Sequence, residues 1–198
     1  GPAINACVNR PVSVVVNNDG EVFISDQDNH IVRKVDKDGI ISRFAGIFGS
    51  GYYSGDGGLA TGAQLNQPQG LAINREGELL IADTNNNVIR KVDKNGIIST
   101  VVDELSSPVA VSVGQDGELF IVESSSYSNQ VTKVDNNGLK MTIAGTSVSG
   151  PSISDFHLPD NVPLAFVSSV SVLSDTEFIV ADTYNHMIKK VDINTKVI

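Results

Sequence analysis

Hydrophobic residues in this chain fall into short runs separated by polar turns, and the runs recur in groups of four. The first group covers residues 12–16, 21–25, 31–35 and 40–45. Apolar runs of this length, bounded by turn residues and rich in valine and isoleucine, predict strands. Residues 12–16 show little alternation, which predicts a strand that is buried on both faces.

Tight turns connect neighbouring runs. Asp19-Gly20 and Asp38-Gly39 lie between runs of the first group, and glycine readily adopts the positive φ that a short hairpin requires. Equivalent turns recur in the later groups at 76–77, 95–96, 116–117, 137–138, 175–176 and 194–195. Each group therefore predicts an antiparallel meander, and threonine replaces glycine in both turns of the fourth.

One sequence motif is repeated in all four groups, at residues 26–35, 83–92, 123–134 and 182–191. Repetition at a period of tens of residues is typical of propellers and solenoids. Continuous apolar strands in an antiparallel sheet need cover on both faces, so the small sheets must stack on one another. Stacking around an axis gives an all-β propeller of four-stranded antiparallel blades. A sandwich is the competing architecture, but it would not repeat its turns so regularly.

Two of the repeats contain a recognisable triplet. Asn29-His30-Ile31 and Asn185-His186-Met187, together with the loop segment 55–68, resemble the NHL-repeat β-propeller family over about residues 8–198. The second and third copies depart from the triplet and read Asn86-Asn87-Val88 and Asn129-Gln130-Val131. The resemblance implies a fold that is usually six-bladed, in proteins that mostly act as binding or scaffolding domains.

The repeats divide the chain into predicted segments within one domain. Blades are expected at about 11–46, 68–103, 108–145 and 167–198, with long inter-blade loops at 47–67 and 146–166. Residues 1–10 are expected to be a lead-in, in which Gly1-Pro2 resembles the remnant of a cleaved tag. Four blades ending within a strand suggest part of a larger, six-bladed ring, or a chain that self-associates through open blade faces. A closed four-bladed ring is the alternative.

Charge and cysteine content exclude several classes of function. The net charge of −9 argues against a nucleic-acid partner and against an anionic membrane surface. No apolar run is long enough to insert into a membrane, and the composition is that of a soluble protein. The lone Cys7 excludes an intramolecular disulfide and a cysteine-based zinc site.

The predicted strand directions separate two ends of each blade. The hairpin end carries tight turns and is expected to be featureless, whereas the loop end carries the inter-blade loops and the turn between the second and third strands. Partner-binding candidates at the loop end are Tyr52, Tyr53, Asp56, Tyr127, Phe156 and His157. Exposed tyrosines are good interface anchors, although the adjacent pair at 52 and 53 could equally fold down onto the blade.

Carboxylates recur at one position in every blade: Asp26, Asp83, Glu123 and Asp182. A ring of metal ligands is one interpretation, but acceptance of backbone hydrogen bonds within each acidic residue's own turn is favoured, because repetition in all copies indicates structure. His30, His157 and His186 show no ligand spacing. The sequence predicts neither a metal nor another cofactor, and it contains no catalytic constellation.

These observations predict a non-enzymatic propeller that binds a protein, or a carbohydrate, through its loop end. A metal-dependent hydrolase or lyase of the six-bladed propeller type is one alternative, although the chain matches none of the ligand patterns of such enzymes. An architectural repeat segment that self-associates through open blade faces is the other.

Overall fold

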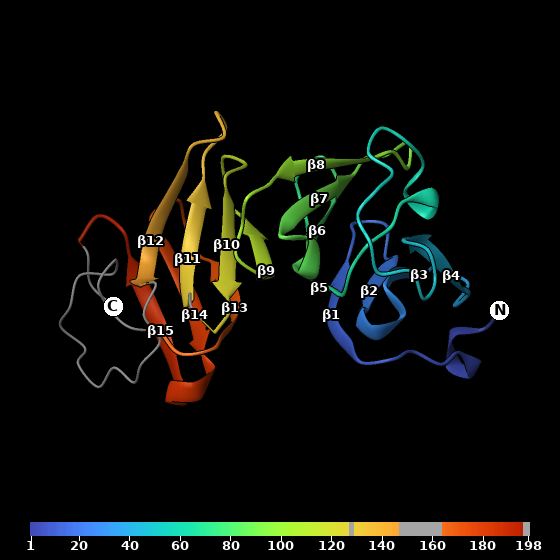
Figure 1. The fold of residues 1–198 in the computed structure, drawn as a ribbon, viewed down its shortest axis with the longest axis horizontal. Coiled ribbons are helices and arrows are strands. Elements are labelled where there is room, and N and C mark those ends of the chain that lie inside the picture. Colours follow the sequence, from blue (N-terminus) through green and yellow to red (C-terminus); the bar gives the residue numbers. More distant parts are fainter. Residues whose placement is uncertain (127–128, 147–163, 196–198) are drawn as a thin grey trace. The chain divides into compact units, whose positions relative to one another are not determined.

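The computed structural model describes residues 1–126, 129–146 and 164–195, and its strands form four separate antiparallel sheets (Figure 1). Each sheet follows the order of the chain, as in the blade of a propeller, and the predicted all-β propeller class is confirmed. Residue contacts group the blades into two compact units, Gly1–Glu104 and Leu105–Ile198. The sequence suggested a single domain, and the two units are described separately below.

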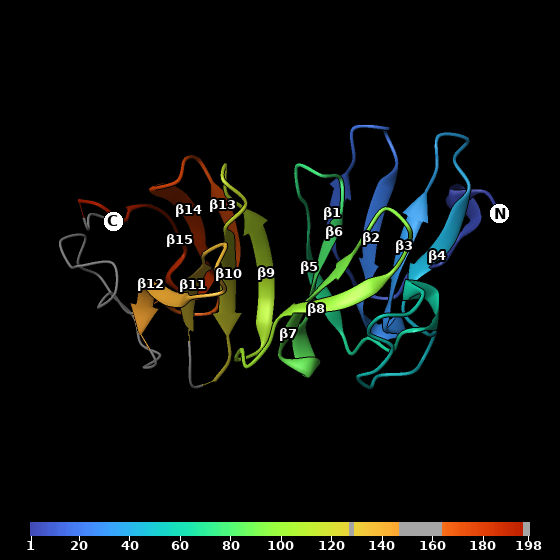
Figure 2. The same ribbon diagram turned by 90° about the horizontal axis from the view of Figure 1, so that it is seen from above.

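The first unit contains two complete blades. The first blade consists of β1 (Pro11–Val16), β2 (Val22–Asp26), β3 (Ile31–Val35) and β4 (Ile41–Ala45), and the second of β5 (Pro68–Ile73), β6 (Leu79–Asp83), β7 (Val88–Val92) and β8 (Ile98–Val102). In this unit the hairpins β1–β2, β3–β4 and β5–β6 lie at one end, and the loop between β4 and β5 lies at the other (Figure 2). We call these the hairpin end and the loop end, as in the sequence prediction.

Asparagine and aspartate side chains fix the hairpins. Asp36 Oδ1 accepts the backbone N–H groups of Asp38 (3.0 Å) and Ile40 (2.9 Å). Asp93 and Asp135 accept the equivalent pairs of N–H groups in later blades. Gly39 adopts a φ of +74° within this turn, which explains the recurring Asp-x-x-Gly pattern.

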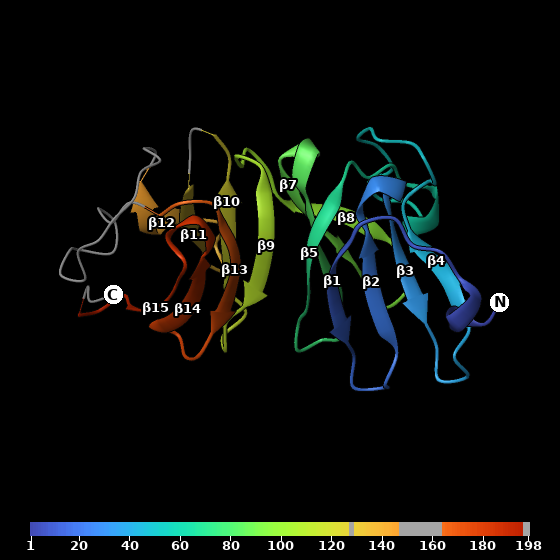
Figure 3. The same ribbon diagram turned by 90° about the horizontal axis from the view of Figure 1, so that it is seen from below.

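The core of the first unit lies between its two blades. The innermost strands β1 and β5 lie side by side (Figure 3). Phe23 of the first blade, Leu79 and Ile81 of the second, and Leu65 of the loop are all buried in one apolar cluster. Phe44 packs edge-on against Phe23 with ring centroids 4.8 Å apart. Burial of apolar area between sheets is therefore what joins the blades, at about 25 cal/mol per Å².

The prediction that residues 12–16 are buried on both faces is wrong. Val14 and Val16 are 61% and 59% exposed. Their side chains share a face with Ile24, which pairs with Val14 across the β1–β2 ladder. In the second blade the equivalent face, which includes Ile81, packs against the first blade. Within the first unit no blade packs on the Val14 face, so valine here meets solvent.

The lead-in also belongs to the first blade. Ile41 donates its N–H to the carbonyl of Gly1 (2.9 Å), and Ala3 donates to the carbonyl of Gly39 (2.8 Å). The first residues, predicted to be a tag remnant and lead-in, thus bond to the outer edge of β4. A short 3₁₀ turn, η1 (Ala3–Asn5), follows directly.

The second unit contains a four-stranded and a three-stranded blade. The third blade consists of β9 (Pro108–Val113), β10 (Leu119–Ser124), β11 (Asn129–Val134) and β12 (Lys140–Thr146), and the fourth of β13 (Val167–Val172), β14 (Glu177–Asp182) and β15 (Met187–Asp192). Three strands of the last blade are described, and residues 196–198, where its fourth strand was expected to continue, lie outside the described residues. Phe120 and Phe178, with ring centroids 5.7 Å apart, lie fully buried between the blades.

The 3₁₀ segments in the part of the chain that the structure describes are all short. They are η1, η2 (Gln27–Asn29), η3 (Ala60–Gly62), η4 (Thr84–Asn86) and η6 (Thr183–Asn185). Within the described ranges, none of the helices has the length and apolar character that crossing a membrane would require.

Candidate functional site

A buried carboxylate at the end of the second strand of each blade holds the segment that enters that blade. Asp26 Oδ1 accepts the backbone N–H of Asn9 at 2.7 Å. The equivalent bonds run from Asn66 to Asp83 (2.7 Å), from Ser106 to Glu123 (2.6 Å) and from Ala165 to Asp182 (2.7 Å). Each backbone donor precedes its carboxylate by 17 residues. The expectation of backbone donors within each acidic residue's own turn is corrected, because these side chains point toward the incoming segment.

The turn itself contributes a side-chain donor. Asn29, Asn86 and Asn185 each donate from Nδ2 to the carboxylate three residues earlier, at 2.8 Å. The next residue, His30, Asn87 or His186, is left-handed with φ between 56° and 60°. Asparagine and histidine are enriched in this conformation relative to other non-glycine residues. The asparagine of the triplet thus holds the carboxylate, and the residue after it reverses the chain.

A third group compensates the buried charge, and this group differs between blades. Arg33 Nε donates to Asp26 at 2.9 Å, and Lys189 Nζ lies 3.0 Å from Asp182. Glu123 instead accepts hydrogen bonds from Gln130 (3.0 Å) and Thr132 (2.5 Å). All four repeated carboxylates therefore have several internal partners, as structural groups do.

Asp83 lies in the most enclosed of these arrangements. Burial raises its pKa to about 6, against the opposing effects of the Asn66 and Asn86 hydrogen bonds and of Arg90. Arg90 Nη1 lies 3.5 Å from Asp83 Oδ2, and neither side chain is exposed to solvent. The desolvation of the carboxylate is thus larger than the stabilisation by these partners.

Arg90 also anchors the long loop at 47–67. Arg90 Nη2 donates to Asp56 Oδ1 at 2.6 Å, and its guanidinium lies 5.0 Å from the centroid of the Tyr53 ring. The Tyr53 hydroxyl donates to Asp56 (3.1 Å) and forms a hydrogen bond with Thr100 (2.9 Å). Tyr53 and Asp56, both predicted partner-binding residues, therefore attach the loop to the second blade.

Tyr52, in contrast to Tyr53, is largely exposed to solvent. Its side chain is 70% exposed, while its carbonyl accepts a hydrogen bond from Asn86 Nδ2 at 2.8 Å. Phe48 in the same loop is 62% exposed, and the neighbouring Gly49 N–H donates to the carbonyl of Asn29 at 3.0 Å. The loop thus displays two aromatic side chains from a backbone that is bonded to the blades.

The second unit displays an aromatic pair that the sequence prediction missed. Phe166 and Tyr184 stack with ring centroids 4.6 Å apart and an interplanar angle of 12°, and both are more than half exposed. Phe166 N–H donates to Asn129 Oδ1 at 2.9 Å, and Tyr184 N–H donates to the carbonyl of Ala165 at 3.0 Å. Departure from the repeat is the signal that could have found them. The other copies have Arg10, Gln67 and Ser107 at the first position, and Asp28, Asn85 and Ser125 at the second.

The remaining candidates cannot be placed in this arrangement. Tyr127, Phe156 and His157 lie outside the described residues, as does most of the predicted loop at 146–166. Their suggested role in partner binding stays a prediction. Among residues 1–126, 129–146 and 164–195, no group of three or more His, Cys, Asp or Glu side chains is arranged to hold a metal ion.

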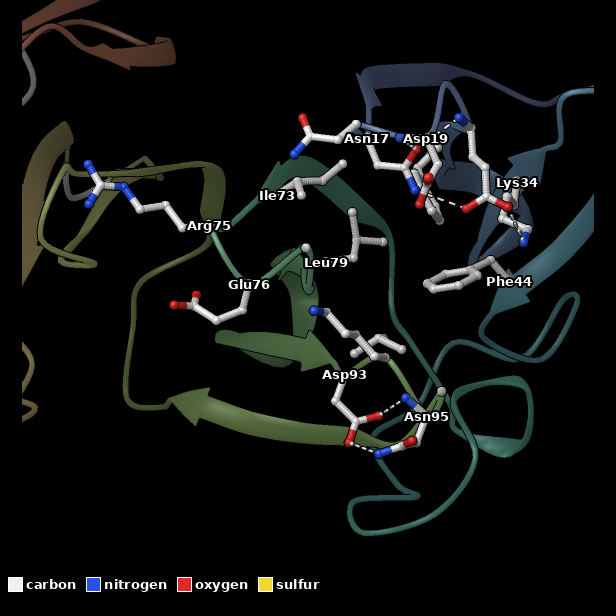
Figure 4. Close-up of a pocket in the computed structure, with 17 residues that line it drawn as sticks. Asn17, Asp19, Lys34, Phe44, Ile73, Arg75, Glu76, Leu79, Asp93 and Asn95 are labelled. Atoms are coloured by element: carbon white, nitrogen blue, oxygen red, sulfur yellow. Dashed lines mark hydrogen bonds and ion pairs between the residues drawn. The ribbon is translucent and has the colours of Figure 1, made fainter.

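The hairpin end of the first unit is not featureless, contrary to expectation. A cavity of about 560 Å³ lies there between the first and second blades (Figure 4). Its apolar walls are formed by Phe23, Phe44, Ile73, Leu79 and Val92. Polar and charged side chains of three hairpins line the rest. The tight turns alone gave no indication of a cavity, because it is formed by the packing of two blades.

Most charged groups that line this cavity are already engaged. Glu21 accepts hydrogen bonds from Lys34 (2.7 Å) and Asn17 (2.9 Å), and these groups, with Lys34 first, lower its pKa. Asp93 accepts the hairpin N–H groups, principally that of Ile97, which lower its pKa as well. Arg75 and Glu76 extend away from the apolar walls in Figure 4.

The sequence of this chain is similar to a family model and to parts of longer proteins. A family model described as the Teneurin NHL domain matches residues 45–107, which cover the loop at 47–67 and the second blade. Mouse Teneurin-4 is 32% identical over 137 residues, which is 62% of this chain and 5% of the relative. The chloroplastic protein SUPPRESSOR OF QUENCHING 1 of Arabidopsis thaliana is 37% identical over 95 residues, 48% of this chain and 9% of the relative.

A solved structure shares the fold at low sequence identity. The streptogramin B lyase structure superposes with a TM-score of 0.65 and 14% identity, over 97% of this chain and 54% of that chain. At this identity the likeness concerns the fold alone. The chain spans less than a tenth of the length of the two sequence relatives above.

Proposed function

Because this chain belongs to the NHL-repeat β-propellers, we propose that it is a non-enzymatic domain that binds a protein through aromatic side chains at the loop ends of its blades. The displayed residues are Phe48 and Tyr52 in the first unit, and Phe166 and Tyr184 in the second.

The proposal rests on aromatic side chains that are exposed to solvent while the backbone that bears them is hydrogen-bonded to a blade. Tyr184 is 68% exposed and Tyr52 is 70% exposed, yet the backbone around each is hydrogen-bonded to a blade. Tyrosine and tryptophan are enriched at interface hot spots, because they bury a large area at a small cost in side-chain entropy. A side chain that is already held in place loses less freedom on binding.

No described group of residues favours the hydrolase or lyase alternative. The repeated carboxylates are occupied by internal hydrogen bonds and ion pairs. A binding role needs only the display of the loop ends, and it also suits the position of the predicted candidates Tyr127, Phe156 and His157 in the sequence.

The proposal is tested with alanine variants. Wild type, Tyr52→Ala, Tyr184→Ala and the hairpin-end control Leu139→Ala are immobilised and exposed to an extract of the source cells. Retained proteins are identified, purified and titrated. We expect a partner whose affinity falls at least about tenfold, or 1.4 kcal/mol, in one tyrosine variant and is unchanged in the control. A partner bound equally by all four would contradict the proposed surface, and a purified glycan as the retained species would replace the protein partner.

A further inference from the structure

The cavity at the hairpin end of the first unit has a counterpart in the second unit, and the two differ in a way that points to a ligand. The counterpart, of about 240 Å³, lies between the third and fourth blades. Aligning the repeats places Lys133, Ile143, Thr176 and Ile193 of the second cavity at the positions of Lys34, Phe44, Gly77 and Lys94 of the first. These substitutions at equivalent positions contribute to the different linings of the two cavities.

A lysine crosses the second cavity but not the first. Lys133 Nζ lies 3.0 Å from Glu118 in its own blade and donates to the carbonyl of Asp175 in the next blade at 3.3 Å. The same ammonium lies 5.3 Å from the centroid of the Phe120 ring. Lys34, at the equivalent position in the first cavity, pairs with Glu21 of its own blade at 2.7 Å. The apolar walls of the first cavity are therefore not crossed by a lysine, and the partly buried Phe44 lines this cavity.

The first cavity also carries a cation that the second lacks. Lys94 is a lining residue, and its Cε lies 3.7 Å from the position that a side-chain carbon on Gly77 would occupy. Neither a hydrogen bond nor an ion pair of the Lys94 ammonium occurs among the described residues. Ile193 and Thr176 replace this lysine and this glycine in the second cavity. Lys94 is thus available for an anion, next to a residue that leaves room for one.

We propose that this cavity, which we call the blade groove, binds a small amphipathic carboxylate. The ring or branched chain of the ligand lies against the partly buried Phe44 and Ile73, and its carboxylate pairs with the Lys94 ammonium. The cavity has the size of ordinary small-molecule sites, and its lining combines apolar side chains with polar and charged side chains of the hairpins. The blade groove lies at the hairpin end, so the proposal is independent of binding at the loop end.

The test uses 4-phenylbutyrate as the probe and 4-phenyl-1-butanol as its uncharged analogue. Each is titrated into the ¹⁵N-labelled chain, and amide shifts are followed at Gly77 and Gly96 of the blade groove and at Thr176 and Asn194 of the second cavity. We expect saturable shifts in the blade groove alone, with the acid binding about threefold to tenfold more tightly than the alcohol.

Two variants test which residues of the blade groove bind the probes. Each variant introduces the residue type that stands at the equivalent position of the second cavity. Lys94→Ile introduces the residue type of Ile193, and it is expected to reduce the affinity for the acid to that for the alcohol. Phe44→Ile introduces the residue type of Ile143, and it is expected to weaken the binding of both probes. Lys37→Ile is the matched control, because Lys37 occupies the position of Lys94 in the first blade and does not line the cavity.

Three results would overturn the proposal. They are an absence of saturable shifts in the wild type, equal affinities for the acid and the alcohol, and an acid preference that survives Lys94→Ile. Unchanged amide spectra of the free variants establish that the fold is intact.

Discussion

The second and third blades each bury a carboxylate, but they compensate its charge with different side chains. Both bury a carboxylate that accepts a backbone N–H from the incoming segment, at 2.7 Å for Asp83 and 2.6 Å for Glu123. In the second blade the fully buried Arg90 faces the carboxylate, whereas in the third blade Thr132 and Gln130 donate hydrogen bonds to it. The tether to the incoming segment is kept in both, while the compensating group varies.

The variable group determines what else the blade can hold. A guanidinium has five N–H donors, so Arg90 reaches Asp56 and the carbonyl of Ser54 in the long loop as well as Asp83. Thr132 and Gln130 have fewer donors, and the bonds described for them reach only Glu123 and each other. A change at one repeated position thus converts an internal tether into an anchor for an inter-blade loop.

Removal of Arg90 should have the largest effect. Arg90→Ala leaves the buried Asp83 without its cation and releases Asp56, so we expect a loss of about 3 to 5 kcal/mol in the free energy of unfolding of the first unit. Thr132→Ala in the third blade should cost about 1 to 2 kcal/mol, because one hydrogen bond to a charged group is lost. Amide hydrogen exchange of β6–β7 and of β10–β11 measures the two losses separately. Equal losses would show that the arginine has no special role.

The pH dependence of Asp83 should be the next largest effect. Burial raises its pKa from an ordinary value of 3.8 to about 6, so the folded state binds the proton more tightly than the unfolded state does. The stabilisation from this proton is complete below about pH 4 and is lost as the pH rises through about 6.

Asp83→Asn removes this titration. Relative to wild type, we expect the free energy of unfolding of the variant to rise by about 2 to 3 kcal/mol between pH 4 and pH 7. Glu21→Gln is the control with the opposite sign. The pKa of Glu21 is lowered, principally by the hydrogen bond from Lys34, so its contribution to stability is lost as the pH falls. A difference between Asp83→Asn and wild type that does not change with pH would contradict the raised pKa.

The carboxylates also show how far the sequence could be read. The hairpin signals and apolar runs correctly indicated antiparallel blades, because both signals are local. Repetition of Asp26, Asp83, Glu123 and Asp182 indicated only that these carboxylates are structural groups. The donors that these carboxylates bind lie 17 residues upstream, and that distance depends on how β1 pairs with β2 in three dimensions. For the same reason the blade groove was missed, since its walls come from strands of two blades.

The exposure of individual side chains also could not be predicted from the sequence. The valine-rich run at 12–16 looks like a strand with two buried faces, but whether a second sheet covers Val14 is a property of neighbouring blades and not of the run. Tyr52 and Tyr53 are adjacent in the sequence, yet only the structure shows that Tyr53 bonds to Asp56 and Thr100 while Tyr52 faces solvent.

A smaller loss of stability is expected from a side-chain hydrogen bond that occurs within each unit. This bond joins the segment that enters one blade to the blade before it. His30 Nδ1 accepts the N–H of Gln67 at 3.1 Å, and Asn129 Oδ1 accepts the equivalent N–H of Phe166 at 2.9 Å. His30→Ala loses this bond and places alanine at a φ of 59°, so we expect a loss of about 1 to 2 kcal/mol. Exchange of the Gln67 amide should accelerate accordingly.

The matched variant is His30→Asn. Asn87 adopts a φ of 60° at the same position of the second blade, and Asn129 makes the same bond in the third. Asparagine should therefore restore both the left-handed backbone and the acceptor, and protect the Gln67 amide as histidine does. If His30→Asn were as damaging as His30→Ala, the ring itself, which packs against Gly51, would be the stabilising feature.

The smallest effect separates the two adjacent tyrosines of the long loop. Tyr53→Phe keeps the ring beside Arg90 but removes the hydroxyl that bonds to Asp56 and Thr100. Because the site is half exposed, we expect a loss of about 0.5 to 1 kcal/mol in the free energy of unfolding. In Tyr52→Phe a hydroxyl without a described hydrogen bond is removed, so the free energy of unfolding should be unchanged. Circular dichroism during urea unfolding measures both variants. If Tyr52→Phe destabilised the chain as much as Tyr53→Phe, the division of the loop into an anchoring tyrosine and a displayed tyrosine would be wrong, because the hydroxyl of Tyr52 would then also have a structural partner.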